Sequence, residues 1–305
     1  MNTSYFLVII SGIISGFIVF GGQILARMGF SLFQISTLPY IFSLVLIAPV
    51  FFLVKRSKNL KEALPILLLY GFVEAGINIC QFAAPILGAS IAITVLLLYV
   101  QPLWTTLSSW LFLKEKITKI NVIACAMVLF GVVLIVNPFN IGSVGSWAGI
   151  IVAFLGGIFL SGWVSVGSHL SKKGVKPIET MFLGSLIMLV ILSVTFPIAR
   201  NFITDQALVG FSFDKNAIAW IIIFGFGIVA FIVNHFVYLQ GTKKVPTADA
   251  GIIMLIEPVV GTTLAIIFFH QLLTPSIIIG GILILFANYL VITQGRKISK
   301  TKKVE

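Results

Sequence analysis

The stretch from Leu98 to Thr118, LYVQPLWTTLSSWLFLKEKIT, is echoed by the stretch from Ile256 to Thr274, IEPVVGTTLAIIFFHQLLT. The echo extends beyond both stretches at a constant spacing of 156 residues, without a gap. Matches between apolar residues arise easily by chance, whereas matched Asn, Pro and Thr at one fixed spacing indicate a true internal repeat. The pairs are Gly71 and Gly227, Asn78 and Asn234, Ala92 and Ala248, Pro102 and Pro258, Thr106 and Thr262, and Thr118 and Thr274.

The beginning of the chain aligns with its middle at a shorter spacing of 145 residues. The spacing grows by 11 because the loop after the seventh apolar stretch is longer than the loop after the second. We therefore predict a first repeat over residues 1–138, a second over 146–296, and a basic tail over 297–305. The matched pairs are Gly12 and Gly157, Gly22 and Gly167, Leu25 and Leu170, Gly29 and Gly174, and Gln34 and Glu179.

The composition of the chain is that of a membrane protein. Of its 305 residues, 59% are hydrophobic and only 10% are charged. A spanning helix needs about 20 apolar residues, and backbone groups in hydrocarbon must pair within the segment. The sequence predicts an all-α integral membrane protein with ten transmembrane helices, over Tyr5–Gly22, Phe33–Val54, Leu64–Ala83, Ala89–Phe112, Ile120–Val136, Trp147–His169, Ile178–Ile198, Ala217–Leu239, Ala248–Phe269 and Pro275–Thr293.

Ten helices in two equivalent sets give five helices to each repeat. Because five is odd, the second repeat must enter the membrane from the side opposite to the first. Inverted repeats of this kind are typical of transporters that work by alternating access. No basic residue precedes the first span and no small-residue cleavage site follows it, so we expect it to be retained rather than removed as a signal peptide.

The net charge of +11 is distributed unevenly between the two sides of the predicted helices. Only Arg27, Arg200 and Lys215 fall on one side. This bias predicts that both termini lie in the cytoplasm and that the basic tail meets anionic lipid rather than nucleic acid. Seventeen basic residues fall on the other side: Lys55, Arg56, Lys58, Lys61, Lys114, Lys116, Lys119, Lys172, Lys173, Lys176, Lys243, Lys244, Arg296, Lys297, Lys300, Lys302 and Lys303.

Ionisable and amide side chains inside the spans are candidates for a binding site, because such groups are costly in a bilayer. Glu74 lies midway along the third span, with Asn78 one helical turn later on the same face. Asn234 and His235 lie late in the eighth span, and Glu257 lies in the ninth. Glu257 is the foremost candidate for substrate binding or proton coupling. For all three ionisable groups the alternative is a structural hydrogen bond, although His235 is also a candidate proton relay.

Two prolines interrupt the fourth and ninth spans at equivalent places. Gln101 precedes Pro102, and Glu257 precedes Pro258. Each proline removes a backbone donor and frees a carbonyl about one turn earlier, and that carbonyl must be paired or face a wet cavity. We therefore predict that both prolines border a central cavity where the repeats meet. Trp104, close to the first proline, is a candidate for its wall.

Other chemistry is not indicated by the sequence. Cys80 and Cys125 are too few and too isolated for a disulfide framework or a metal cluster, and we expect them to pack as small apolar residues. The chain contains no H-E-x-x-H, Walker A or G-x-S-x-G motif. We expect no enzyme activity, no cofactor and no metal, and no ATP-driven transport by this chain alone.

On these features the chain resembles the EamA family of the drug/metabolite transporter superfamily. The resemblance covers nearly all of the chain and rests on the five-plus-five layout and on a family pattern, "leP…a…a…lflgE.lt". Pro102, Leu113, Glu115 and Thr118 match this pattern in the first copy, where Gln101 replaces the usual Glu. The second copy keeps Glu257, Pro258 and Thr274, with His270 and Gln271 in place of a frequent Gly-Glu pair.

The resemblance implies a ten-helix basket whose central cavity is lined by helices one, three, four, six, eight and nine. It also implies export of amino acids or other small metabolites, since family members commonly do this and some accept aromatic compounds or drugs. With Gln101 in the first copy, only Glu257 can serve as the carboxylate of the motif pair. We expect an exporter in the cytoplasmic membrane that works without obligatory oligomerisation. A substrate gradient and proton coupling both remain open as its driving force.

Other functions of a similar architecture remain as alternatives. A nucleotide-sugar or sugar-phosphate carrier would need cationic groups in the cavity, and the interiors of the predicted spans have none. A membrane-embedded enzyme would need an acid–base set, for which Glu257 and His235 are the minimal pair. A lipid flippase or a channel would be distinguished only by assay.

Overall fold

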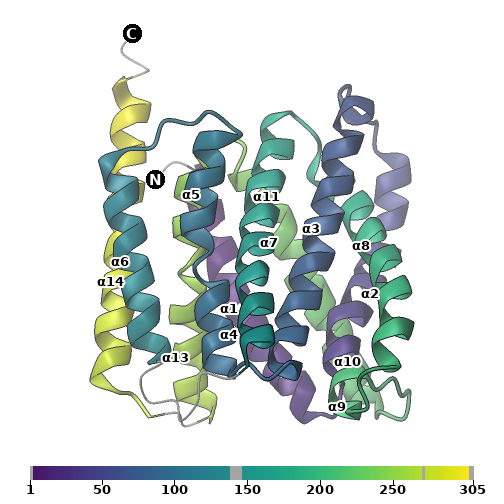
Figure 1. Cartoon of the computed structure of the whole chain (residues 1–305). Coiled ribbons are helices and arrows are strands. Elements are labelled where there is room, and N and C mark those ends of the chain that lie inside the picture. The colour runs from purple at the N-terminus through teal and green to yellow at the C-terminus, as the bar shows by residue number, and fades with distance from the viewer. Residues whose placement is uncertain (1–2, 138–145, 270–271, 302–305) are drawn as a thin grey trace.

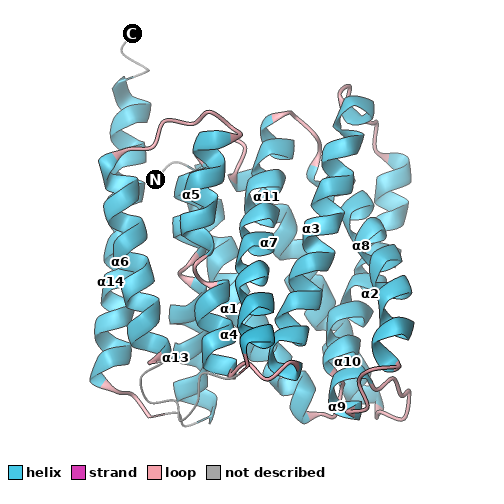
Figure 2. Cartoon of the chain, viewed as in Figure 1, coloured by secondary structure: helices cyan, strands magenta, loops and turns pink. Residues whose placement is uncertain are grey.

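A computed structural model describes residues 3–137, 146–269 and 272–301, which form helices joined by short loops (Figures 1 and 2). The predicted repeat end at Pro138, His270 and Gln271, and residues 302–305 of the predicted tail lie outside the described residues. The first half contains α1 (Thr3–Arg27), α2 (Leu32–Leu53), α3 (Leu60–Ile86), α4 (Ile91–Leu98), α5 (Gln101–Leu111) and α6 (Lys119–Val136). The second half contains α7 (Trp147–Lys172), α8 (Pro177–Arg200), α9 (Gln206–Val209), α10 (Ala217–Gly227), the π-helix η2 (Ile228–Val233), α11 (Asn234–Gly241), α12 (Thr247–Met254), α13 (Glu257–Phe269) and α14 (Pro275–Thr301).

The chain is a multi-pass, all-helical membrane protein. Within the described residues, nine helical segments are long and apolar enough to cross a membrane. The predicted span Ala89–Phe112 is not among them; it is divided into α4 and α5, of 8 and 11 residues. The tenth transmembrane helix therefore stays a prediction.

The helix breaks occur at equivalent positions of the two halves. α4 ends at Leu98 and α5 begins at Gln101, while α12 ends at Met254 and α13 begins at Glu257. Each new helix thus starts at the residue before its proline. A proline in the first turn of a helix has no N–H that would need a partner there, whereas in the helix interior it removes a backbone hydrogen bond.

Close contacts at glycines relate the two halves to each other. A Cβ on Gly157 of α7 would lie 2.4 Å from the carbonyl oxygen of Leu97 in α4. A Cβ on Gly12 of α1 would lie 3.3 Å from the carbonyl oxygen of Ile253 in α12. Gly12 and Gly157 are one pair of the sequence repeat, and Leu97 and Ile253 are separated by the second spacing, 156 residues. Each half therefore contacts the other in the same way.

A second pair of close contacts between crossing helices is also repeated in the two halves. A Cβ on Gly71 of α3 would lie 2.9 Å from the carbonyl oxygen of Gly184 in α8, and one on Gly227 of α10 would lie 2.8 Å from that of Pro39 in α2. Along the whole interface, α3 packs on α7 and α8, while α10 and α11 pack on α1 and α2. This exchange of partners is the geometry expected of two repeats related by a pseudo-twofold axis.

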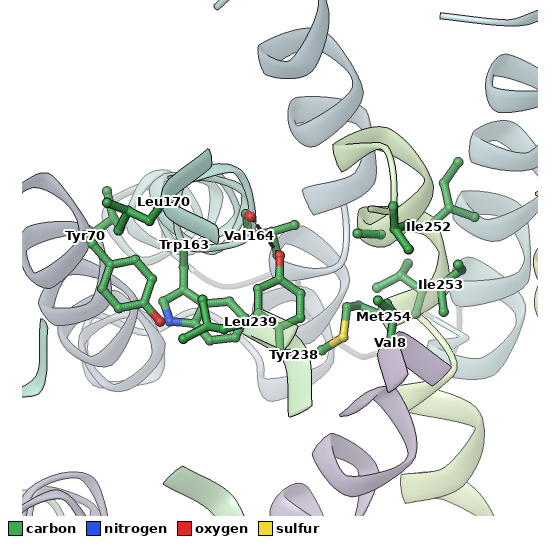
Figure 3. Packing of buried hydrophobic residues seen from close by; sticks show 14 of the residues in the cluster. Val8, Tyr70, Trp163, Val164, Leu170, Tyr238, Leu239, Ile252, Ile253 and Met254 are labelled. Atoms are coloured by element: carbon green, nitrogen blue, oxygen red, sulfur yellow. Dashed lines mark hydrogen bonds between the residues drawn. The ribbon is translucent and has the colours of Figure 1, made fainter. Parts of the chain in front are cut away.

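The loops of the helix bundle lie at two opposite faces. The first turn of α1 and the last turns of α14 lie on the upper side in Figure 1, with the loops 54–59, 112–118, 173–176 and 242–246. We call this side the basic face, because these loops and the adjoining helix ends carry most of the described Lys and Arg residues. Between the faces the core is apolar and aromatic, and Figure 3 shows Tyr70, Trp163 and Tyr238 side by side within it.

Candidate functional site

The two helix breaks are joined by a hydrogen bond between the repeats. The hydroxyl of Tyr99, at the break between α4 and α5, donates to Oε1 of Glu257, the first residue of α13, over 3.0 Å. Tyr99 is buried and Glu257 is partly buried. A carboxylate and a phenol therefore meet where each of the two spans changes from one helix to the next.

Gln101, the counterpart of Glu257, is fixed by its neighbours. It is buried, and its Nε2 donates to Oγ1 of Thr105 over 2.6 Å. Thr105 in turn donates to Oγ of Ser161 in α7 over 3.1 Å. A Cβ on Gly251 of α12 would lie 3.1 Å from Nε2 of Gln101, so α12 passes directly over this amide.

Trp104 lies one turn after the break, and its ring packs edge-on against Phe154 with centroids 5.4 Å apart. Its indole Nε1 is buried and has no hydrogen-bond partner among the described residues. Such a donor is free to bind a group that enters from outside the protein.

A second polar group links α3 to α11. Oε1 of Glu74 lies 3.0 Å from Nε2 of His235 and accepts a hydrogen bond of 3.1 Å from the hydroxyl of Tyr40 in α2. Both members of the pair are buried, with 2% and 6% of their surfaces exposed. His235 therefore pairs with Glu74 and not with Glu257, so the minimal acid–base pair considered from sequence is not formed.

The π-helix η2 ends directly before Asn234 and His235. A π-helical turn contains an extra residue, so it rotates the side chains that follow it, and such turns are frequent at functional sites. The corresponding part of α3 is regular α-helix. The two halves therefore present different side chains at equivalent places.

The repeat-related asparagines illustrate this difference. Asn234 accepts a hydrogen bond of 2.7 Å from Ser11 and donates one of 3.1 Å to Ser15, which ties it to α1. Asn78 donates to the carbonyl oxygen of Glu74 over 2.9 Å. It also lines a mostly apolar cavity of about 110 Å³ between α2, α3, α8 and α9.

Sequence reasoning missed one buried carboxylate altogether. Asp249 lies in the first turn of α12, and its two oxygens accept hydrogen bonds of 2.6 Å from Tyr5 of α1 and 2.7 Å from Asn121 of α6. It falls within the predicted span Ala248–Phe269, so the argument that selected Glu74 would have selected it too. Tyr40 and Tyr99 were also missed, because a tyrosine in a span carries no distinctive signal.

An all-helical bundle with paired helix breaks and buried ionisable side chains defines a multi-pass membrane transporter. A family model described as the EamA-like transporter family matches residues 2–137 and 147–293. The chain therefore belongs to the EamA-like transporter family, within the drug/metabolite transporter superfamily, which is a family of transporters and not of enzymes. The resemblance noted from sequence is confirmed.

Two similar proteins are also named as transporters, and their names give no substrate. An uncharacterized transporter of Clostridium kluyveri is 25% identical over 100% of this chain and 97% of its own length. The uncharacterized transporter YojE of Bacillus subtilis is 23% identical over 57% of this chain and 52% of its own length. A protein of known crystal structure superposes with a TM-score of 0.73 over 98% of this chain and 99% of that chain, at 18% identity, which shows the fold alone.

Proposed function

We propose that this transporter carries small organic solutes such as amino acids out of the cell by alternating access. The hydrogen bond between Tyr99 and Glu257 is the observation that carries the proposal. Interrupted helices at equivalent places of two repeats mark the binding sites of many secondary transporters. Here the two breaks meet side chain to side chain, so a solute bound between them would contact both repeats.

The chemistry around the breaks suits a zwitterion with an apolar part. The carboxylate of Glu257 is a partner for an ammonium group, which would displace the hydroxyl of Tyr99. The start of α5 carries the positive end of a helix dipole, and the unpaired Nε1 of Trp104 is a further donor for a carboxylate. The rings of Trp104 and Phe154 offer an apolar surface.

The remaining predicted cavity residues are proposed to border the same pathway. Gln101 faces α12 beside the first break, and Asn234 lies against α1, which packs along α13. Asn78 faces the cavity near α9. We propose that residues 1–138 and 146–296 form inverted repeats that rock about this region, so that the pathway opens to one face at a time.

We further propose that the basic face lies in the cytoplasm, with both termini and the basic tail. The support is the ratio of seventeen basic residues on this side to three on the other. Basic residues in short loops are retained on the cytoplasmic side of a membrane.

Counterflow in proteoliposomes tests the proposal. Vesicles loaded with unlabelled alanine, threonine, phenylalanine, lysine and glutamate are diluted into each radiolabelled amino acid in turn. We expect saturable accumulation of at least one of them, reduced about tenfold or more in Glu257→Gln, since loss of a charged hydrogen bond is worth at least about 1.4 kcal/mol. Glu62→Gln, in the first turn of α3, is the matched control.

Absence of counterflow for every amino acid would overturn the substrate class. Flux that rises linearly with concentration would overturn alternating access in favour of a channel. Equal kinetics in Glu257→Gln and the wild type would remove Glu257 from the binding site.

A further inference from the structure

Glu74 and His235 form a buried carboxylate–imidazole pair that the proposed contacts to an amino acid leave unused. Among the described residues, His235 is the only basic side chain that forms an ion pair with Glu74. The pair joins α3 of the first half to α11 of the second, and Tyr40 from α2 bonds the same carboxylate oxygen. A buried charge pair of this kind is expensive to maintain in a membrane unless it has a function.

Two polar atoms of the pair itself are buried and have no hydrogen-bond partner among the described residues. They are Oε2 of Glu74 and Nδ1 of His235. Each unpaired group of this type costs about 1–3 kcal/mol. A Cβ on Gly184 of α8 would lie 2.5 Å from the ring of Tyr70 and 3.5 Å from Oε2 of Glu74. These two buried polar atoms without a hydrogen-bond partner are therefore gathered at the contact between Glu74 and His235.

Aromatic rings surround the imidazole of His235. The ring centroids of Trp163, Phe231 and Tyr40 lie 5.1, 5.8 and 6.3 Å from that of His235. Trp163 belongs to α7, Phe231 to η2 and Tyr40 to α2, so aromatic side chains from three helices enclose the imidazole.

We infer that Glu74 and His235 together bind the proton that drives transport. This inference rests on the proposed function, because the proton is exchanged for the solute. With one proton on the pair its net charge is zero; when the proton leaves, one negative charge remains on Glu74, held by the hydroxyl of Tyr40. Because the two residues belong to different repeats, the change in charge acts directly across the interface that must move.

The other groups around the pair do not exchange protons in the same range of pH. Tyr40 from α2, Tyr70 from α3 and Tyr238 from α11 are the titratable groups near it, and a phenol ordinarily ionises near pH 10. The packed helices α7 and α8 contribute Trp163, Gly184 and Met188, which do not titrate.

The first test observes His235 directly and needs no substrate. The chain has three histidines, His169, His235 and His270, so ¹⁵N-histidine spectra in lipid nanodiscs are assigned by replacing each with Gln. We expect the pH response of the His235 signal to differ between the wild type and Glu74→Gln, because the carboxylate bonds the imidazole directly. Glu62→Gln should leave it unchanged. A His235 signal that does not titrate, or that is indifferent to Glu74→Gln, would overturn the inference.

The second test separates failure of the proton site from failure of the proposed function. Counterflow of the labelled amino acids without a pH gradient reports solute exchange, whereas accumulation driven by an imposed pH gradient reports proton coupling. We expect Glu74→Gln and His235→Gln to keep counterflow and to lose gradient-driven accumulation, while His169→Gln keeps both. Gradient-driven accumulation that persists in Glu74→Gln would overturn the proton site, and loss of wild-type counterflow would overturn only the proposed substrates.

Discussion

The carboxylate of Glu115 caps a helix from the other half of the chain. Its Oε2 accepts the backbone N–H of Thr247, the first residue of α12, over 2.7 Å, and its Oε1 accepts the hydroxyl of the same residue over 2.9 Å. Lys172, at the end of α7, bonds both Glu115 and Thr247. The loop between α5 and α6 is thereby tied to α7 and α12 at the basic face, where the two repeats must separate if this face opens.

Removal of this cap is expected to destabilise the protein. Glu115→Ala leaves the first backbone N–H of α12 without its acceptor and leaves Lys172 only its bond to Thr247. Loss of a helix cap costs about 1–2 kcal/mol. Glu115→Gln keeps an acceptor and should cost less than half as much. Thermal unfolding in detergent measures both, with Glu62→Ala as control. An unchanged midpoint in Glu115→Ala would show that the cap contributes nothing to stability.

Asp249 is expected to be more sensitive than Glu115, because it is buried and both of its oxygens are bonded. Asp249→Ala leaves the hydroxyl of Tyr5 and the amide of Asn121 unpaired, at about 1–3 kcal/mol each. Asn at the same position accepts only one of the two bonds, so about half of the loss should remain. A double-mutant cycle of Asp249→Asn with Tyr5→Phe, followed by urea unfolding, measures the coupling. Strictly additive effects would mean that the bond to Tyr5 contributes no stability.

The glycine crossings give a prediction with an internal control. Gly157→Ala places a Cβ 2.4 Å from the carbonyl oxygen of Leu97, and a backbone atom cannot move aside as a side chain can. We expect a loss of about 1–3 kcal/mol. Gly22→Ala, also within a helix, meets nothing within 4 Å and should stabilise by about 0.5–1 kcal/mol through helix propensity. Unfolding midpoints that move in the same direction for the two variants would contradict the close contact between Gly157 and the carbonyl oxygen of Leu97.

The crossings also show why so much of the fold could be predicted from sequence. Gly12 and Gly157, like Gly71 and Gly227, match because each pair serves the same close approach in both halves. Matched polar residues and prolines then fixed the register of the repeat. One sequence was sufficient to predict the repeat, because the two halves of the chain can be compared with each other.

Pairings between helices were not predictable in the same way. Helical spacing places Glu74 on a face of α3, but it does not say that His235 and Tyr40 turn toward that face. The π-helix before His235 changes the direction of that side chain and leaves no mark in the apolar sequence of η2. Asp249 could have been predicted, because its charge within the span Ala248–Phe269 is a sufficient reason to select it.

The orientation of the protein in the membrane gives the last prediction. Lys58, between α2 and α3, lies exposed on the basic face, and Thr204, between α8 and α9, lies exposed on the opposite face. The native Cys80 and Cys125 are buried, so they should not react with a membrane-impermeant maleimide. We expect the Cys of Thr204→Cys to be labelled in intact cells and that of Lys58→Cys only after permeabilisation, because the positive-inside bias places the basic face in the cytoplasm. Labelling of Lys58→Cys in intact cells would place the basic face outside the cell and overturn the proposed orientation.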